Sequence, residues 1–222
     1  MKWKILGASL FFILNLIQPA LARDDFQYWS QYSFKMYDGK FIDLVTFAEL
    51  RMKEDTTKAG LYFISERLTF DYFKNFQMGL NYTYLNTRKT TIDDDFKFHH
   101  RFELEGNPHW SLGERFKVKM RNRMEFRWIE DNGSHNTRYR QQWTLEYPLN
   151  KWKTIQSVYI SSEFFYDIAK HEYNENRSVP LGMQFKINDK SALKVYYMIQ
   201  STKSSQEWGS NHILGTLISF KF

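Results

Sequence analysis

The sequence predicts an all-β protein, a single antiparallel transmembrane β-barrel of 10–12 strands that follows an N-terminal signal peptide. Three observations predict this fold. Apolar and polar residues alternate along almost the whole mature chain. A secretory leader precedes that region, and no later apolar run is long enough for a membrane-spanning helix. The last strand ends on the aromatic residue Phe222.

The alternation divides the chain into eleven segments of about 10 to 14 residues, a length that suits tilted membrane strands. The segment from Phe116 to Trp128 places Phe, Val, Met and Trp on one face and Arg, Lys and Glu on the other. Bacterial single-chain barrels have an even number of strands. We therefore expect ten strands if Phe26–Tyr37 lies outside the barrel, or twelve if one strand escapes the pattern.

The leader occupies residues 1–22. Lys2 and Lys4 form a basic start, Ile5–Ile17 is an apolar run, and residues 20–22 form the small-x-small cleavage site Ala-Leu-Ala. An uncleaved anchor is the alternative. Residues 23–222 then form the barrel, and we expect it in the outer membrane of a Gram-negative-type bacterium. The chain has no cysteine, which excludes disulfides and thiolate metal sites.

The terminal segment Asn211–Phe222 carries Phe222, Phe220 and Ile218 on one face. It resembles the closing strand of bacterial outer-membrane barrels, which the assembly machinery of that membrane reads. Predicted partners are therefore this machinery and outer-membrane lipid. Aromatic residues near strand ends suit the two membrane interfaces, and we assign this role to Trp29, Trp128, Trp143 and Tyr147.

Long and short connections alternate between the segments, with Gly106–Glu114 as one long exception. If the chain ends in the periplasm, the short turns fall on the periplasmic side, as in outer-membrane barrels.

Three short motifs point to a family. These are K-M-R-N-R-M-E-F-R-W at 119–128, R-Y-R at 138–140 leading to Y-P-L at 147–149, and S-E-F-F at 162–165. In these the chain resembles the bacterial family called domain of unknown function 2490. The resemblance runs from about Trp29 to Phe222 and implies an outer-membrane barrel without an assigned activity.

The polar face should line the lumen. Its basic cluster comprises Lys97, Arg101, Lys119, Arg121, Arg123, Arg127, Arg138 and Arg140, and its carboxylates are Glu103, Glu105, Glu125 and Glu146. Pairing outward from Gly106–Glu114 places Glu105 near Arg115 and Glu103 near Lys117. Across the next hairpin, Glu125 could meet Arg140 and Lys119 could meet Glu146. The lumen wall should carry an excess of positive charge.

This pattern favours a structural barrel or narrow pore with an Arg/Lys-rich lumen, because the lumen of a small barrel is filled by its own side chains. One alternative is an anion-selective channel for small acidic solutes. A second is an outer-membrane lipid-modifying enzyme, for which the sequence offers only the outward His212 close to Ser210.

No histidine lies in a recognised catalytic frame, so we predict no catalytic residue, no metal site and no cofactor. The acidic run at residues 93–95 is interpreted as a solvated loop. Nucleic acid is not an expected partner, because the basic residues lie on one face of membrane-type strands.

Overall fold

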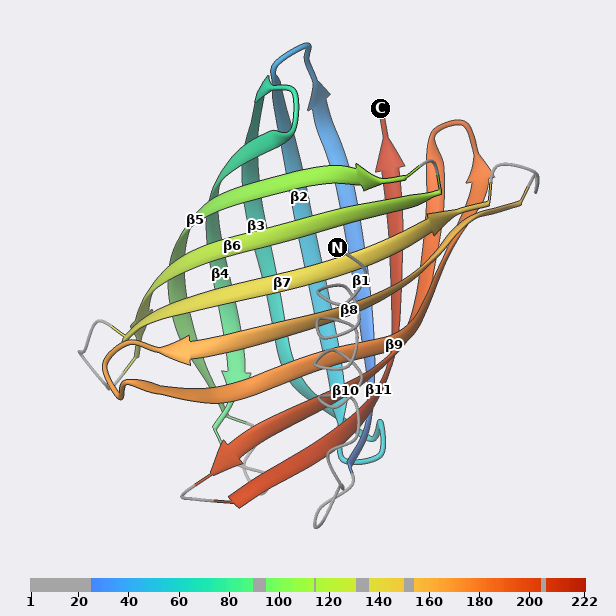
Figure 1. Ribbon diagram of the computed structural model, residues 1–222. Coiled ribbons are helices and arrows are strands. Elements are labelled where there is room, and N and C mark those ends of the chain that lie inside the picture. The colour runs from blue at the N-terminus through green and yellow to red at the C-terminus, as the bar shows by residue number, and fades with distance from the viewer. Residues whose placement is uncertain (1–24, 90–94, 114, 131–135, 150–153, 205–206) are drawn as a thin grey trace, which may run out of the picture.

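A computed structural model describes residues 25–89, 95–113, 115–130, 136–149, 154–204 and 207–222, and these residues form a closed β-barrel (Figure 1). The eleven strands are β1 (Asp25–Asp38), β2 (Ile42–Lys53), β3 (Lys58–Phe73), β4 (Phe76–Arg88), β5 (Phe96–Leu112), β6 (Phe116–Ile129), β7 (Asn136–Pro148), β8 (Ile155–Asp167), β9 (Glu172–Asn188), β10 (Ser191–Ser204) and β11 (Glu207–Lys221). The predicted signal peptide, residues 1–22, lies outside the described residues. In the part of the chain that the structure describes, no helix is long and apolar enough to cross a membrane.

The barrel closes through a parallel pair. Each strand pairs antiparallel with the next along the chain, but β1 and β11 run in the same direction, in register from Asp25↔Asn211 to Lys35↔Lys221 (Figure 1). When strands alternate in direction, the first and last of an odd number must point the same way. The all-β barrel is thus confirmed. The fully antiparallel sheet was wrong, and so was the choice between ten and twelve strands, because parallel closure removes the need for an even number.

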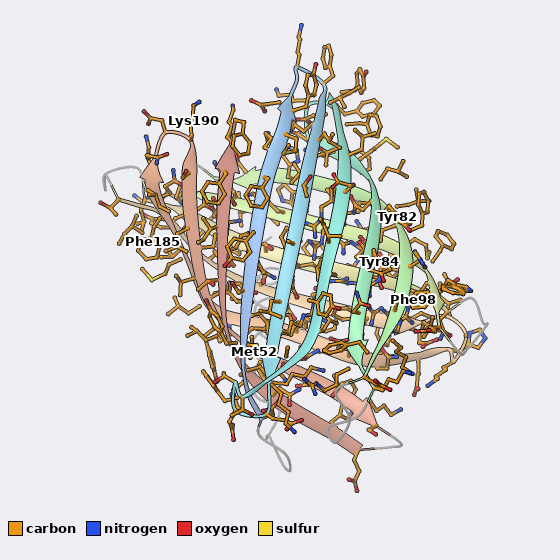
Figure 2. The ribbon with its side chains drawn as sticks, turned by 180° about the vertical axis from the view of Figure 1, so that it is seen from behind. Met52, Tyr82, Tyr84, Phe98, Phe185 and Lys190 are labelled. Carbon is orange, nitrogen blue, oxygen red and sulfur yellow. The ribbon has the colours of Figure 1, made fainter. Side chains whose placement is uncertain are left out.

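Burial is reversed relative to a water-soluble barrel. Among the described residues, 18 buried side chains are polar or charged and seven are hydrophobic, while 29 large hydrophobic side chains are exposed. Figure 2 shows Tyr82, Tyr84 and Phe98 on the outer side of β4 and β5, and Phe185 on the outer side of β9. Strand residues alternate between the two faces, so the period-two pattern of the sequence becomes a polar lumen and an apolar outer wall.

The structure also corrects one predicted loop. Gly106–Glu114 was expected to connect two strands, but β5 continues to Leu112, and Gly113 turns the chain with a φ of 64°. Gly106 lies inside β5, where its carbonyl accepts a 3.0 Å hydrogen bond from the side-chain amide of Asn122 on β6. The connection between β5 and β6 is therefore short. The alternation of long and short connections was nevertheless wrong, because two residues join β10 to β11 and six join β7 to β8.

Two glycines shape the lumen wall. Gly182 is the cross-strand partner of Tyr159, and Gly215 is the partner of Tyr196. Each tyrosine ring lies so close over its glycine that a Cβ there would overlap it. The absence of a side chain lets both rings lie flat against the wall, which leaves the centre of the lumen open for other side chains.

Candidate functional site in the lumen

Charged side chains from five neighbouring strands, β5 to β9, and from β2 cross the middle of the lumen. Alternation points them inward, and most are buried from solvent. We call this set the ion-pair layer: Glu49, Arg51, Arg101, Glu103, Glu105, Arg123, Glu125, Arg138, Arg140, Glu163, Glu175 and Arg177.

Glu125 is the centre of the ion-pair layer and is 0% exposed. Arg140 Nη1 donates to its Oε1 at 2.6 Å, and Arg138 Nε donates to its Oε2 at 2.8 Å. Arg101 Nη1 lies 3.5 Å away and Arg123 Nη1 4.0 Å away. One carboxylate thus balances guanidinium groups from β5, β6 and β7, an arrangement that only tight hydrogen bonding makes tolerable in a buried setting.

Guanidinium groups extend the layer over neighbouring strands. Arg140 also donates to both oxygens of Glu163, at 3.1 and 3.0 Å. Arg138 Nη1 reaches Glu175 at 3.3 Å, and Arg177 Nε donates to the same carboxylate at 2.7 Å. The planar, five-donor guanidinium is suited to such bridging, and the result is a continuous ion-paired layer across β5–β9.

Phe165 fills the space beneath these guanidinium groups and is 0% exposed. The guanidinium carbons of Arg138, Arg140 and Arg177 lie 4.7, 4.5 and 4.6 Å from its ring centroid. A buried aromatic ring attracts cations through its quadrupole. Phe165 therefore gives the three guanidinium groups a shared, buried aromatic surface to pack on.

The opposite side of the lumen is apolar. Trp29, Val179, Met198 and Ile213 form a buried cluster next to the parallel β1–β11 pair. Trp29 lies under the guanidinium of Arg51, at 3.6 Å from the ring centroid. Its assignment to a membrane interface was wrong, because it occupies the inward face of β1 and is only 2% exposed.

A cavity of about 440 Å³ adjoins the ion-pair layer. Its lining includes Lys119 near the start of β6, Glu146 near the end of β7, and Lys194 near the start of β10. These three positions lie toward the end of the barrel where β11 terminates, which is also the end of the β9–β10 turn. The cavity thus extends from the ion-pair layer toward the Phe222 end of the barrel.

The lining of this cavity carries nine lysine and arginine side chains and four carboxylates. Lys119 Nζ lies 2.6 Å from Glu146, and Arg121 Nη2 lies 2.9 Å from Glu163. Among the described residues, Arg67 and Lys194 make no ion pair and no hydrogen bond through their side chains. The cavity therefore has a surplus of positive charge.

The structure places all eight predicted basic residues and all four predicted carboxylates on the inner face. Five of the basic residues line the cavity: Arg101, Lys119, Arg121, Arg123 and Arg140. Arg138 lies in the ion-pair layer but outside the cavity lining. Lys97 and Arg127 lie toward the opposite end of β5 and β6, away from the cavity.

The ion pairs predicted between β6 and β7 were correct, whereas those predicted between β5 and β6 were wrong. Glu125–Arg140 and Lys119–Glu146 form ion pairs, both at 2.6 Å. The pairing of Glu105 with Arg115 and of Glu103 with Lys117 was wrong. Glu105 and Glu103 instead pair with Arg123, because the late turn at Gly113 shifts the register of β5 against β6.

Sequence reasoning missed the partners that lie farther along the chain. Glu163, Glu175 and Arg177 complete the ion-pair layer, and Arg67 and Lys194 complete the cavity. The inward alternation of Arg67 and of the S-E-F-F segment at 162–165 was the available signal. Which of these residues meet across the lumen depends on the register of every intervening strand.

Some polar side chains face outward. Thr46 Oγ1 donates to Glu66 at 3.0 Å near the middle of β3. Tyr82 bonds His100 Nδ1 at 2.6 Å, and Tyr197 bonds His212 Nδ1. Ser210 Oγ lies 3.0 Å from Ser201 Oγ. No group of three potential metal-ligating His, Asp or Glu residues occurs within the described ranges.

The comparisons with known proteins give one match. The sequence model of a family described as protein of unknown function (DUF2490) matches residues 26–211. A search of curated proteins and a search of solved structures each found no significant match. The matched residues cover β1 to β10 and the first part of β11, so they include the ion-pair layer and almost all of the cavity lining.

Proposed function

The chain belongs to the DUF2490 family of proteins of unknown function, and we propose from its geometry that it is an outer-membrane β-barrel whose lumen is closed by the ion-pair layer. The observation that supports this proposal is the reversal of burial. Soluble proteins rarely expose large contiguous apolar surfaces, whereas this barrel exposes large hydrophobic side chains on nine of its eleven strands and buries carboxylates and guanidinium groups.

Aromatic contacts near both ends of the strands agree with a membrane location. Phe34 stacks on Phe220 at 5.4 Å near the end of the barrel that holds the β9–β10 turn. At the other end, Phe98 lies 5.4 Å from Trp128. Membrane barrels have an apolar band between two aromatic girdles. Glu66 is a charged exception near the middle of the outer wall, and its hydrogen bond from Thr46 reduces the cost of that position.

The closed lumen favours a structural barrel over an open pore. Glu125 and Phe165 are both 0% exposed, and Arg123 and Arg140 are nearly as buried. An anion-selective channel needs a continuous aqueous path, which this layer interrupts. A lipid-modifying enzyme needs an activated nucleophile, but the Ser210 hydroxyl bonds Ser201 and the His212 Nδ1 bonds Tyr197.

For orientation, we propose that Phe222 ends in the periplasm after export by the signal peptide at residues 1–22. Parallel closure then places the start of β1 at the opposite, external end. We also propose that Phe222, Phe220 and Ile218 form the strand signal for the barrel assembly machinery. Replacing Phe222 by Ser should slow assembly in cells while leaving refolding into detergent unchanged; equal assembly rates would contradict this role.

Refolding into lipid vesicles tests the proposed function. We expect a protein that requires detergent or lipid to stay in solution and that migrates differently on gels before and after heating. In planar bilayers it should show no conductance above background. Solubility without detergent would overturn the membrane assignment, and steady conductance by the unmodified protein would overturn the closed lumen.

A further inference from the structure

We propose that the lumen cavity binds a small organic anion, whose carboxylate or phosphate group is held between Arg67, Arg121 and Lys194. This inference goes beyond the proposed function, since it requires the folded barrel but not a particular membrane. It starts from two cations without a counterion, Arg67 and Lys194, in a cavity large enough for a ligand.

Arg67 is prepared to bind an anion. Its guanidinium stacks over Phe47, with the central carbon 3.7 Å from the ring centroid, and Phe47 in turn stacks on Phe63. The Nε atom is buried and has no hydrogen-bond partner. A buried, unpaired guanidinium is costly, and stacking on an aromatic ring fixes its plane without using its donors.

Lys194 presents a second unpaired cation from the other side of the cavity. Its Nζ lies 6.0 Å from the ring centroid of Tyr159, and within the described part of the chain it has no carboxylate partner. Glu146, a carboxylate of the same cavity, is already bonded to Lys119 at 2.6 Å. The charge of Lys194 is therefore available to a ligand.

Arg121 completes a ring of three cations. It shares Glu163 with Arg140, and its Nε is buried without a partner. Arg67, Arg121 and Lys194 come from β3, β6 and β10, which are separated by three, four and four steps around the closed sheet. All three side chains line the same cavity, so a ligand bound there can be reached by cations from three parts of the barrel wall.

The rest of the cavity suggests an apolar body on the ligand. Its volume of about 440 Å³ falls in the range of small-molecule sites, about 300–1,000 Å³. Phe47, Phe63, Tyr159, Tyr196 and Met198 supply apolar lining next to the cations. A bare inorganic ion would leave most of this surface unused, so the cavity fits an organic acid better.

Calorimetric titration of the refolded barrel in neutral detergent at low salt tests this site. The probes are benzoate and phenyl phosphate, with benzyl alcohol and benzylammonium as neutral and cationic controls of similar size. We expect one anion per barrel and no binding of either control. The tighter of the two anions identifies the preferred headgroup. Failure of both anions to bind, or equal binding of benzyl alcohol, would overturn the proposal.

Variants localise the binding. Arg67→Met and Lys194→Met should each weaken anion binding by about 10-fold to 100-fold, which is the usual effect of losing one charge-assisted hydrogen bond. Arg127→Met removes a lumen cation outside the cavity and should leave affinity unchanged. Without anion, Arg67→Met should resist denaturation as well as or better than the parent protein, because it removes an unpaired buried charge.

Lys194→Met decides the matter if Arg67→Met does not refold. Unchanged affinity in the folded cavity variants, or an equal loss in Arg127→Met, would contradict the site. Since the titration uses barrel folded in detergent, its failure would leave the membrane proposal standing.

Discussion

Neutralising Glu125 should destabilise the barrel more than neutralising any exposed carboxylate. Glu125 accepts hydrogen bonds from Arg140 at 2.6 Å and from Arg138 at 2.8 Å, and it is 0% exposed. Glu125→Gln keeps the size of the side chain but removes the charge. Four guanidinium groups within 4.0 Å then lose their shared anion.

The size of the effect follows from burial. Removing one partner of a buried ion pair costs about 3–5 kcal/mol, because the other charge stays buried without compensation. The matched control is Glu146→Gln. Glu146 also accepts a 2.6 Å hydrogen bond, but its partner Lys119 is 52% exposed. Glu146 is itself 16% exposed. A pair with one partner in water is closer to an exposed pair, which contributes only about 0–1 kcal/mol, so this variant should cost much less than Glu125→Gln.

Both variants can be measured by urea unfolding in lipid vesicles, followed through tryptophan fluorescence. Unheated gel migration confirms that each variant has formed the barrel. A double variant with Arg138→Gln should cost less than the sum of the two single changes, since the charges interact directly. Equal stability of Glu125→Gln and Glu146→Gln would refute the view that the ion-pair layer holds the lumen together.

Three further predictions concern the packing of the wall, the orientation of the barrel and its contact with lipid. Gly215→Ala should lower the free energy of unfolding by about 1–3 kcal/mol, because the added Cβ overlaps the ring of Tyr196. In the same unfolding assay, the double variant with Tyr196→Leu should regain most of that stability. No recovery would exclude the steric cause. The chain has no cysteine, so a single introduced cysteine reports on which side of the membrane its turn lies. A membrane-impermeant thiol reagent added to intact cells should label Asp55→Cys, in the β2–β3 turn, whereas Lys190→Cys, in the β9–β10 turn, should react only after lysis. The reverse labelling would invert the proposed orientation. Glu66→Leu should stabilise the barrel in vesicles by up to about 2 kcal/mol, since an outward carboxylate near the middle of β3 is unfavourable in lipid, and a loss of stability there would argue against lipid contact.

The sequence predicted which side chains point into the lumen and which point outward, but it predicted the pairing register between neighbouring strands much less well. Alternation correctly assigned Phe116, Phe126 and Trp128 to the outer face of β6 and Arg121 and Arg123 to the lumen, because side-chain direction depends only on parity along a strand. The eleven segments were also counted correctly. The rule that bacterial barrels have an even number of strands then led to the wrong prediction of ten or twelve strands. A barrel of eleven strands has no open edge when its first and last strands pair in parallel.

Register needs information that no single segment contains. Gly106, Asn107 and Pro108 favour a turn, yet Gly106 and Asn107 pair with β4 inside β5, and the turn forms only at Gly113. The partnership of Arg121 with Glu163 spans a whole intervening strand, so it depends on two registers at once. Trp29 was misassigned for a related reason: an aromatic residue at a strand end suits a membrane interface, and only the closed lumen shows it buried beneath Arg51.

If the apolar outer wall contacts lipid, an arginine at the middle of a strand should destabilise the barrel far more than one at a strand end, and Leu104→Arg measures this difference. Leu104 is the central residue of β5 and is 46% exposed, whereas Leu112 is the last residue of the same strand and is 58% exposed. In lipid, arginine costs about 2–4 kcal/mol at the midplane and about 0–1 kcal/mol near the interface. In vesicles, Leu104→Arg should therefore lower the unfolding free energy by at least about 2 kcal/mol more than Leu112→Arg does. Equal, near-zero effects of the two substitutions would show that the wall faces water.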